Sequence, residues 1–172
     1  MLNALMQISN AVGECKLVDF PGWIEIQSWD WEVEAETSWT KGGGASVGKP
    51  NPGKMNWEHY FDKSSPVLLK YICSGSSFDR VELRMFKGTG QSTQTGTSNQ
   101  FFTMVMEGAF ITKVNQSATE EGNVLQKVEM VFKSVAITYK AQEDGSGGKG
   151  KPAGSTGPGI PFSWDIPGGK VS

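Results

Sequence analysis

The chain has 172 residues with 16 basic and 18 acidic side chains, so a net charge of −2 offers no basic field for nucleic acid or anionic lipid. Its length fits one domain, residues 1 to 172, that buries most of its apolar surface without help from disulfides. The two cysteines, Cys15 and Cys73, are too far apart in sequence for a metal knuckle, and we expect two buried thiols rather than a disulfide.

The first twelve residues contain no Lys or Arg and are interrupted by polar side chains. They match neither a secretory signal nor a membrane span. We therefore expect synthesis in the cytosol and, if the protein is exported, a route that reads no N-terminal signal. A weak alternation predicts a first strand from about Met6 to Val12, after which Gly13 to Pro21 turns the chain.

The next segment, Gly22 to Glu34, is rich in tryptophan. The odd-numbered positions include Trp23, Trp29, Trp31, Val33 and Ala35. The even-numbered positions include Asp30, Glu32, Glu34 and Glu36. Because alternate residues of a strand point to opposite faces, this predicts a strand with Trp29 and Trp31 on a buried face and an acidic face opposite. Ile24 and Ile26 lie on the wrong parity for that pattern, so we infer a β-bulge near residues 27 and 28.

The stretch from Trp39 to Lys54 contains too much Gly and Pro for a regular element and predicts a long loop. Trp39 opens it without a strand partner in the sequence, which is the position of an interface anchor. Lys41, Lys49 and Lys54 are available for polar contacts. A solvated, disordered loop is an equally good interpretation.

A helix is predicted after an extended segment from Met55 to Asp62. Ser64 or Ser65 is suited to the N-cap, Pro66 is favourable in the first turn, and Gly75 can take the left-handed conformation that ends a helix. The apolar stretch between them is long enough for two to three turns.

Alternation from Phe78 to Lys87 predicts a half-buried strand with its polar face outward, and Gly88 to Ser98 reads as a polar turn without a phosphate-binding motif. The runs Gln100 to Thr119 and Val124 to Ala141 are separated by a short polar segment. They predict a long antiparallel hairpin, in which Gly108 permits a bend.

The second run changes the parity of its apolar residues near Lys133 and Ser134, which predicts another offset. Residues of about 143 to 159 form a Gly-rich run that we expect to be flexible, and Ile160 to Ile166 predicts a closing strand at a sheet edge. Bulges supply the bends that a closing sheet needs, so the fold class is mostly β: an antiparallel β-barrel of two packed sheets with one short α-helix.

His59 is the only histidine, which removes the usual Ser-His-Asp, Cys-His and multi-histidine sites. We interpret it as a packed or surface strand residue. Asp30, Glu32 and Glu34 lie near one another, but their spacing is that of any solvated strand face. We predict no catalytic residues, no metal ligands, no cofactor and no enzyme activity.

Several segments, in this order, resemble the haemolysin-coregulated protein (Hcp) family, which forms the inner tube of the type VI secretion system. They are the Gly13-Glu14 turn, the strand Gly22 to Trp31, the helix start Phe61 to Leu69, the strand Phe78 to Leu83, the strand Val131 to Tyr139 and the ending Phe162 to Asp165. The tryptophan strand and the Asp-Lys-Ser-Ser-Pro helix start are the more specific of these.

The resemblance implies a compact β-barrel that assembles as a hexameric ring. Rings would stack into a tube that a contractile sheath expels behind a tip (spike) protein, with small effectors carried in the lumen. It further implies assembly in the bacterial cytoplasm followed by secretion without a signal peptide, and no nucleic acid or membrane insertion. Ser38 to Lys54 is then the candidate arm between rings or subunits.

Two other classes stay open at this point. One is a secreted β-barrel that binds small molecules or glycans through its tryptophans, although core packing or an interface is the simpler account of those residues. The other is an enzyme that uses carboxylates. A tail-tube protein of another contractile injection device is a close neighbour of the tube interpretation.

Overall fold

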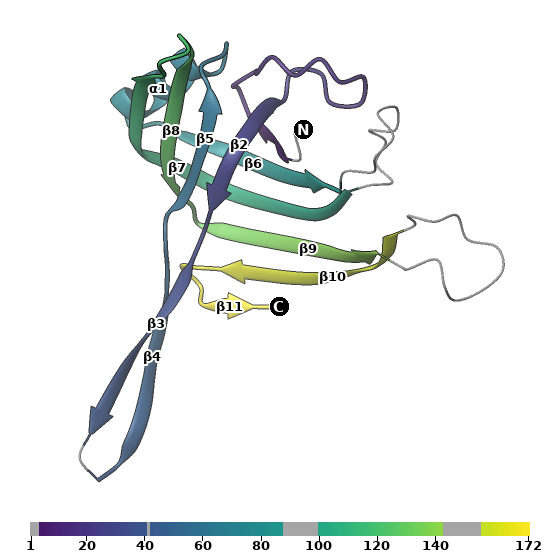
Figure 1. Ribbon diagram of the computed structural model, residues 1–172. Coiled ribbons are helices and arrows are strands. Elements are labelled where there is room, and N and C mark those ends of the chain that lie inside the picture. The colour runs from purple at the N-terminus through teal and green to yellow at the C-terminus, as the bar shows by residue number, and fades with distance from the viewer. Residues whose placement is uncertain (1–3, 41, 88–99, 143–155) are drawn as a thin grey trace, which may run out of the picture.

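The structure is a computed structural model that describes residues 4–40, 42–87, 100–142 and 156–172 (Figure 1). Within these ranges it has eleven strands and one helix. The elements are β1 (Ala4–Ile8), β2 (Ile24–Asp30), β3 (Val33–Thr40), β4 (Gly44–Pro52), β5 (Met55–Tyr60), α1 (Ser65–Ser74), β6 (Ser77–Phe86), β7 (Gln100–Ala118), β8 (Val124–Val131), β9 (Ser134–Gln142), β10 (Thr156–Asp165) and β11 (Lys170–Val171).

Strands β7, β6, β1, β2, β5 and β8 pair in that order, and β8 pairs back onto β7 to close an antiparallel barrel. The closure depends on the length of β7, whose first half pairs with β6 and β9 and whose second half pairs with β8. Gly108 lies between the halves with φ 60°, a conformation that glycine adopts without strain. The predicted mostly β barrel with one helix and the bend at Gly108 are confirmed.

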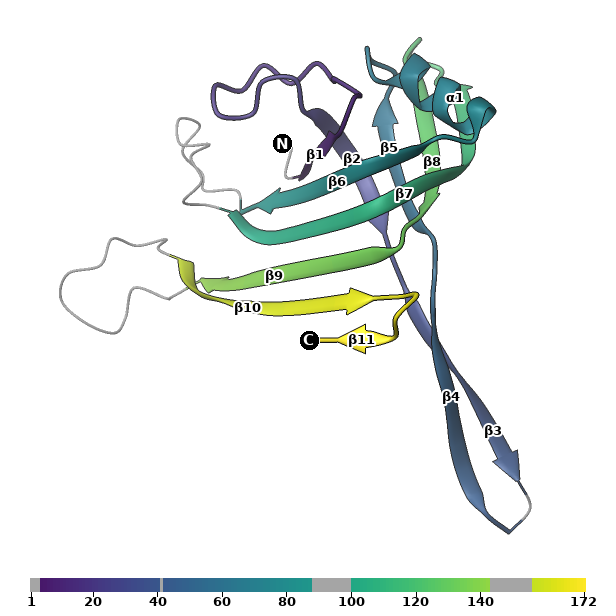
Figure 2. The ribbon, with the colours of Figure 1, turned by 180° about the vertical axis from the view of Figure 1, so that it is seen from behind.

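A smaller sheet extends from the barrel, because β9, β10 and β11 continue outward from β7 (Figure 2). The chain leaves β8 at Val131 and enters β9 at Ser134, so the predicted offset near Lys133 is confirmed. β10 starts at Thr156, earlier than the expected closing strand, and β11 lies outside it in the sheet. The rest of the expected flexible run, residues 143–155, lies outside the described residues, as does the whole of the predicted polar turn, residues 88–98.

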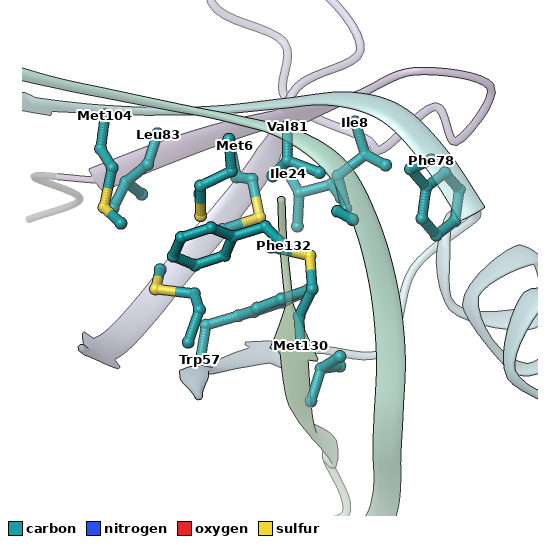
Figure 3. Close-up of a cluster of buried hydrophobic side chains, with 14 of the residues drawn as sticks. Met6, Ile8, Ile24, Trp57, Phe78, Val81, Leu83, Met104, Met130 and Phe132 are labelled. Atoms are coloured by element: carbon teal, nitrogen blue, oxygen red, sulfur yellow. The ribbon is translucent and has the colours of Figure 1, made fainter. Parts of the chain in front are cut away.

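The main core fills the barrel with aliphatic, methionine and aromatic side chains (Figure 3). Ile24 and Ile26 point into it, and the register of β2 against β5 shifts between Ile26 and Ser28, which confirms the predicted bulge. After the shift, Trp29 and Trp31 also turn toward the core. They are half-buried rather than fully buried: Trp29 stacks on Phe102 at 5.4 Å and Trp31 packs on Phe132 at 5.6 Å.

The N-terminal segment departs from prediction. β1 ends at Ile8 rather than at Val12, because Asn10 takes a left-handed turn with φ 66°. The chain then folds over the outside of the barrel and forms a second apolar cluster there. Its buried members are Leu5, Cys15, Phe20 and Trp23.

The N-terminal segment covers part of the polar face of β6, so the expectation that this face is solvated is wrong. Glu82 is only 4% exposed and pairs with Arg80 at 2.8 Å and with Arg84 at 2.7 Å. The guanidinium of Arg84 also lies 5.0 Å from the ring centre of Trp23. The two arginines therefore compensate the burial of this carboxylate, and the ring of Trp23 stabilises the guanidinium of Arg84.

The helix forms as predicted. The backbone N–H of Ser64 donates to Asp62 Oδ1 at 2.8 Å, Pro66 lies in the first turn, and Gly75 ends the helix with φ 67°. Tyr71 stacks on Phe78 at 4.0 Å, so the helix is packed against the barrel. No helix among the described residues is long and apolar enough to cross a membrane.

The two cysteines are both free, but only Cys15 is buried. Burial raises the pKa of the Cys15 thiol. Cys73 is exposed on the last turn of α1, so the expectation of two buried thiols is wrong for this residue: it lies on the helix face that points away from the barrel.

We predict that Gly13→Ala lowers the free energy of unfolding by about 1 to 3 kcal/mol, because overpacking a rigid site is costly. A Cβ at this position would lie 2.5 Å from the carbonyl oxygen of Trp23 and 2.8 Å from Ile24 Cγ1. Urea unfolding followed by tryptophan fluorescence measures the change. The control is Gly48→Ala, where the nearest atom is 3.4 Å away and the change should stay within about 0.5 kcal/mol. Equal stability of the two variants would contradict this account.

Candidate assembly interface

The segment expected to be a loop is mostly a strand. β4 pairs with β3 in a two-stranded antiparallel hairpin that projects from the barrel at the end opposite α1 (Figures 1 and 2). A run rich in Gly and Pro was thus wrongly predicted to be irregular. Each strand of an isolated ribbon has one edge without a partner, so Pro50 and Pro52 can be accommodated there without removing a central ladder bond.

One face of the hairpin is largely apolar. The register pairs Val33 with Pro52, Ala35 with Pro50, Thr37 with Val47, and Trp39 with Ala45. Within this set Trp39 is 82% exposed, Val47 70% and Val33 46%. A two-stranded ribbon has no core of its own, so this face contacts water instead of other apolar side chains.

The opposite face of the hairpin is polar. Glu34 pairs with Asn51, and the hydroxyls of Ser38 and Ser46 form a hydrogen bond across the strands. The predicted alternation of apolar and acidic side chains is therefore correct along β3. What the alternation did not reveal is that the apolar face of β3 is left exposed by the rest of the described residues.

The base of the hairpin is fixed to the barrel. Trp31 Nε1–H donates to the carbonyl of Gly53 at 3.1 Å, and the Gly53 N–H donates to the carbonyl of Glu32 at 2.8 Å. Lys54, predicted as part of the arm, instead lies at this base and pairs with Glu129 of β8 at 3.4 Å. Lys49 is exposed on β4, and Lys41 lies outside the described residues.

The tryptophans do not form a common stripe for stacking sugars. Trp23, Trp57 and Trp164 are buried, Trp29 and Trp31 are half-buried, and Trp39 is exposed. Stacking of a sugar needs an accessible indole face, which only the hairpin offers.

A second surface lies on the outside of β2, β5, β8 and β7. Polar side chains cross these strands in two rows, and they border a hollow of about 460 Å³. The rows are Asp30, Asn56, Glu129 and Lys113, and Ser28, Glu58, Lys127 and Asn115. Neighbours within the rows satisfy one another, since Asn56 donates to Asp30 at 3.2 Å and Lys127 pairs with Glu58 at 3.6 Å. The result is a hydrophilic wall that carries three carboxylates and two lysines.

His59 is fully buried, as the packed interpretation requires. It lies near Ser65 and Asp62, but these residues do not have the arrangement of a hydrolase triad. Trp57 Nε1–H occupies His59 Nδ1 at 3.0 Å, the position that an orienting carboxylate would take, and Asp62 accepts hydrogen bonds from Ser64 instead. In the part of the chain that the structure describes, no three His, Cys, Asp or Glu side chains are grouped to hold a metal ion.

The fold and its exposed surface define a class: a β-barrel protein with an uncovered apolar hairpin suited to association with other chains. The family follows from the sequence. Residues 5–139 match the family described as Type VI secretion system effector, Hcp, and the chain belongs to this family.

A curated relative is the Major exported protein of Pseudomonas aeruginosa, which is 26% identical over 87 residues. That match covers 46% of this chain and 48% of the relative, so the chain spans about half the length of the curated relative that it matches.

Solved structures share the fold. The crystal structure of Hcp1 from Salmonella typhimurium has a TM-score of 0.72 at 20% identity and covers 99% of this chain and 98% of its own. A structure described as a type six secretion system protein has a TM-score of 0.83 at 19% identity, with 100% of both chains covered. A type VI secretion system effector from Yersinia pestis has a TM-score of 0.70 at 19% identity, with coverages of 95% and 100%.

We predict that Trp39→Ser changes the free energy of unfolding of the monomer by less than about 0.5 kcal/mol, because the indole is 82% exposed. Trp57→Ala should cost about 3 to 5 kcal/mol, since that indole is 3% exposed in the core. Urea unfolding at concentrations where sedimentation shows a monomer measures both. A large loss for Trp39→Ser would mean that the hairpin face is already covered within the protomer.

Proposed function

We propose that this protein is a structural subunit of the type VI secretion inner tube, in which hexameric rings stack and a contractile sheath expels the tube. Membership of the Hcp family supports this role, and one observation on the molecule carries it: the uncovered apolar face of the β3–β4 hairpin. An exposed apolar face of this kind marks a site of association with another surface.

The surface that covers the hairpin face belongs to a second copy of the chain. A hydrogen bond fixes the base of the hairpin, and the rest of the hairpin projects beyond the barrel. It therefore contacts a neighbouring copy rather than its own barrel. A hairpin that docks on a different patch of the next copy is a heterologous contact, which generates closed rings or open stacks. Trp39 is its central anchor, as aromatic side chains at interfaces often are.

The polar wall on β2, β5, β8 and β7 faces the ring lumen in this proposal. Contacts between copies bury apolar surface, whereas a wall of polar and charged side chains is suited to contact with water. A hydrophilic lumen also allows small effector proteins to enter and leave without binding tightly to its wall. The residues 1 to 172 act as one such unit.

The location and the other partners of the protein follow from its role in the tube. It forms in the bacterial cytoplasm, contacts the sheath outside and the spike protein at its tip, and leaves the cell without a cleaved signal. The name Major exported protein, borne by the relative from Pseudomonas aeruginosa, supports export.

The hairpin is tested by replacing Trp39 and Val47 together with Ser, which removes the apolar face without changing the barrel. A hot-spot tryptophan contributes about 2 kcal/mol, so association should weaken by about thirtyfold or more. Sedimentation velocity and negative-stain imaging of the purified protein measure ring formation and tube length.

The matched control is Ser38→Ala with Ser46→Ala, which changes adjoining positions on the opposite face of the same two strands. It should assemble like the wild type. If both double variants form the same rings and tubes, the hairpin face is not the contact.

The lumen assignment is tested by labelling Asn115→Cys with a bulky maleimide in a Cys73→Ser background, which removes the exposed native thiol. The new cysteine should react rapidly in monomers and much more slowly in assembled tubes, where the reagent must enter the pore. Equal rates in both states would place this wall outside the tube.

A further inference from the structure

A buried polar group joins one barrel wall to the start of α1, and the proposed tube role does not use it. Its members are Trp57 and His59 of β5, Asp62 of the connecting turn, Ser65 of α1 and Gln126 of β8. His59, Ser65 and Gln126 have no exposed surface. Because His59 is the only histidine in the chain, its titration can be observed without overlap from another imidazole.

The hydrogen bonds fix the neutral state of His59. An indole N–H is a donor only, so Trp57 Nε1, at 3.0 Å, requires that His59 Nδ1 be an acceptor. The proton of neutral His59 therefore lies on Nε2, which donates to Ser65 Oγ at 3.2 Å. Ser65 Oγ also accepts from the backbone N–H of Asp62 at 3.0 Å. Neutral His59 thus connects β5 to the first turn of the helix.

A second proton does not fit this arrangement. It would occupy Nδ1 and direct an N–H at the N–H of Trp57, so the two rings would have to separate. Gln126 lies directly opposite His59 in the β5–β8 register. Its Nε2 donates to Gln116 at 3.0 Å, whereas its Oε1 has no donor among the described residues and is an acceptor available to a protonated ring.

The burial of His59 favours its neutral form at pH 7. Burial lowers the pKa of His59, and this outweighs Asp62 and the Gln126 amide, which raise it. The groups that face the ring from α1, β8 and its own strand are Ser65, Gln126 and Trp57, which are all uncharged. Asp62 in the turn is the charged group that acts on it.

We propose that His59 is an acid-sensitive latch: a proton on Nδ1 turns the ring away from the N–H of Trp57, which withdraws Nε2 from Ser65 Oγ and releases the first turn of α1 from the barrel end. The opened state binds the proton near pH 6.5, whereas the closed state does so only at lower pH. Stability of the closed latch is therefore complete above pH 6.5 and falls as the pH drops below it. Opening increases by up to about tenfold per pH unit and levels off below the closed-state pKa.

Hydrogen exchange of the full-length protein between pH 7.5 and pH 5, corrected for intrinsic exchange rates, tests the latch. The amide of Leu68, which donates to the carbonyl of Ser64 at 3.0 Å, should lose protection by up to about tenfold per pH unit. The amide of Val81 in β6 should not change over the same range. Nitrogen-15 spectra of the imidazole should show the proton on Nε2 at pH 7.5.

Two variants separate the latch from general acid sensitivity. His59→Gln should exchange at Leu68 without this pH dependence. Trp57→Phe removes the donor to Nδ1 and so brings the closed-state pKa nearer to that of the opened state; its loss of protection at Leu68 should level off at a higher pH and be smaller in total. The latch is overturned if Leu68 protection in the wild type does not follow His59 titration, or if His59→Gln keeps the dependence. Should His59→Gln fail to fold, a proton on Nδ1 in the neutral wild type overturns it, and so does a Trp57→Phe profile identical to that of the wild type.

Discussion

The structure depends on one strand that belongs to two sheets. β7 pairs with β9 before Gly108 and with β8 after it, while β6 runs alongside it as far as Phe110, so a single bend both closes the barrel and leaves β9 free to begin the smaller sheet. Closure removes the edges that an open six-stranded sheet would expose. It also fixes the direction of β2 and β5, and therefore the direction in which the hairpin projects.

The elements that were predicted correctly depend on local chemistry. The change of parity between Ile26 and Trp29 needs no knowledge of the partner strand, and it located the bulge to within a residue or two. The helix was equally local, because its proline and terminal glycine have fixed backbone preferences. Family membership came from the order of such elements, since single motifs in this chain are individually weak.

What could not be predicted depends on residues far apart in the sequence. The burial of Glu82 requires that residues 9 to 23 fold over β6, and the polar group at His59 requires Gln126 from a strand more than sixty residues away. The hairpin was missed for another reason. Gly and Pro disfavour strands inside sheets. In a projecting ribbon each strand has a free edge and few side chains to pack against, so Gly and Pro do not argue against a strand there. Of the predicted arm residues, Lys54 lies at the base of the hairpin, and its partner Glu129 on β8 is seventy-five positions further along the chain.

The way the hairpin joins the barrel has a mechanical consequence. β3 continues β2, β4 continues β5, and β2 and β5 are themselves hydrogen-bonded neighbours, so the ribbon is an extension of one barrel hairpin. A pull along its axis loads many backbone hydrogen bonds in shear at once, instead of opening them one after another as a zipper. With Trp31 bonded to Gly53 at its base, the ribbon can transmit axial force into the barrel wall without tearing away from it.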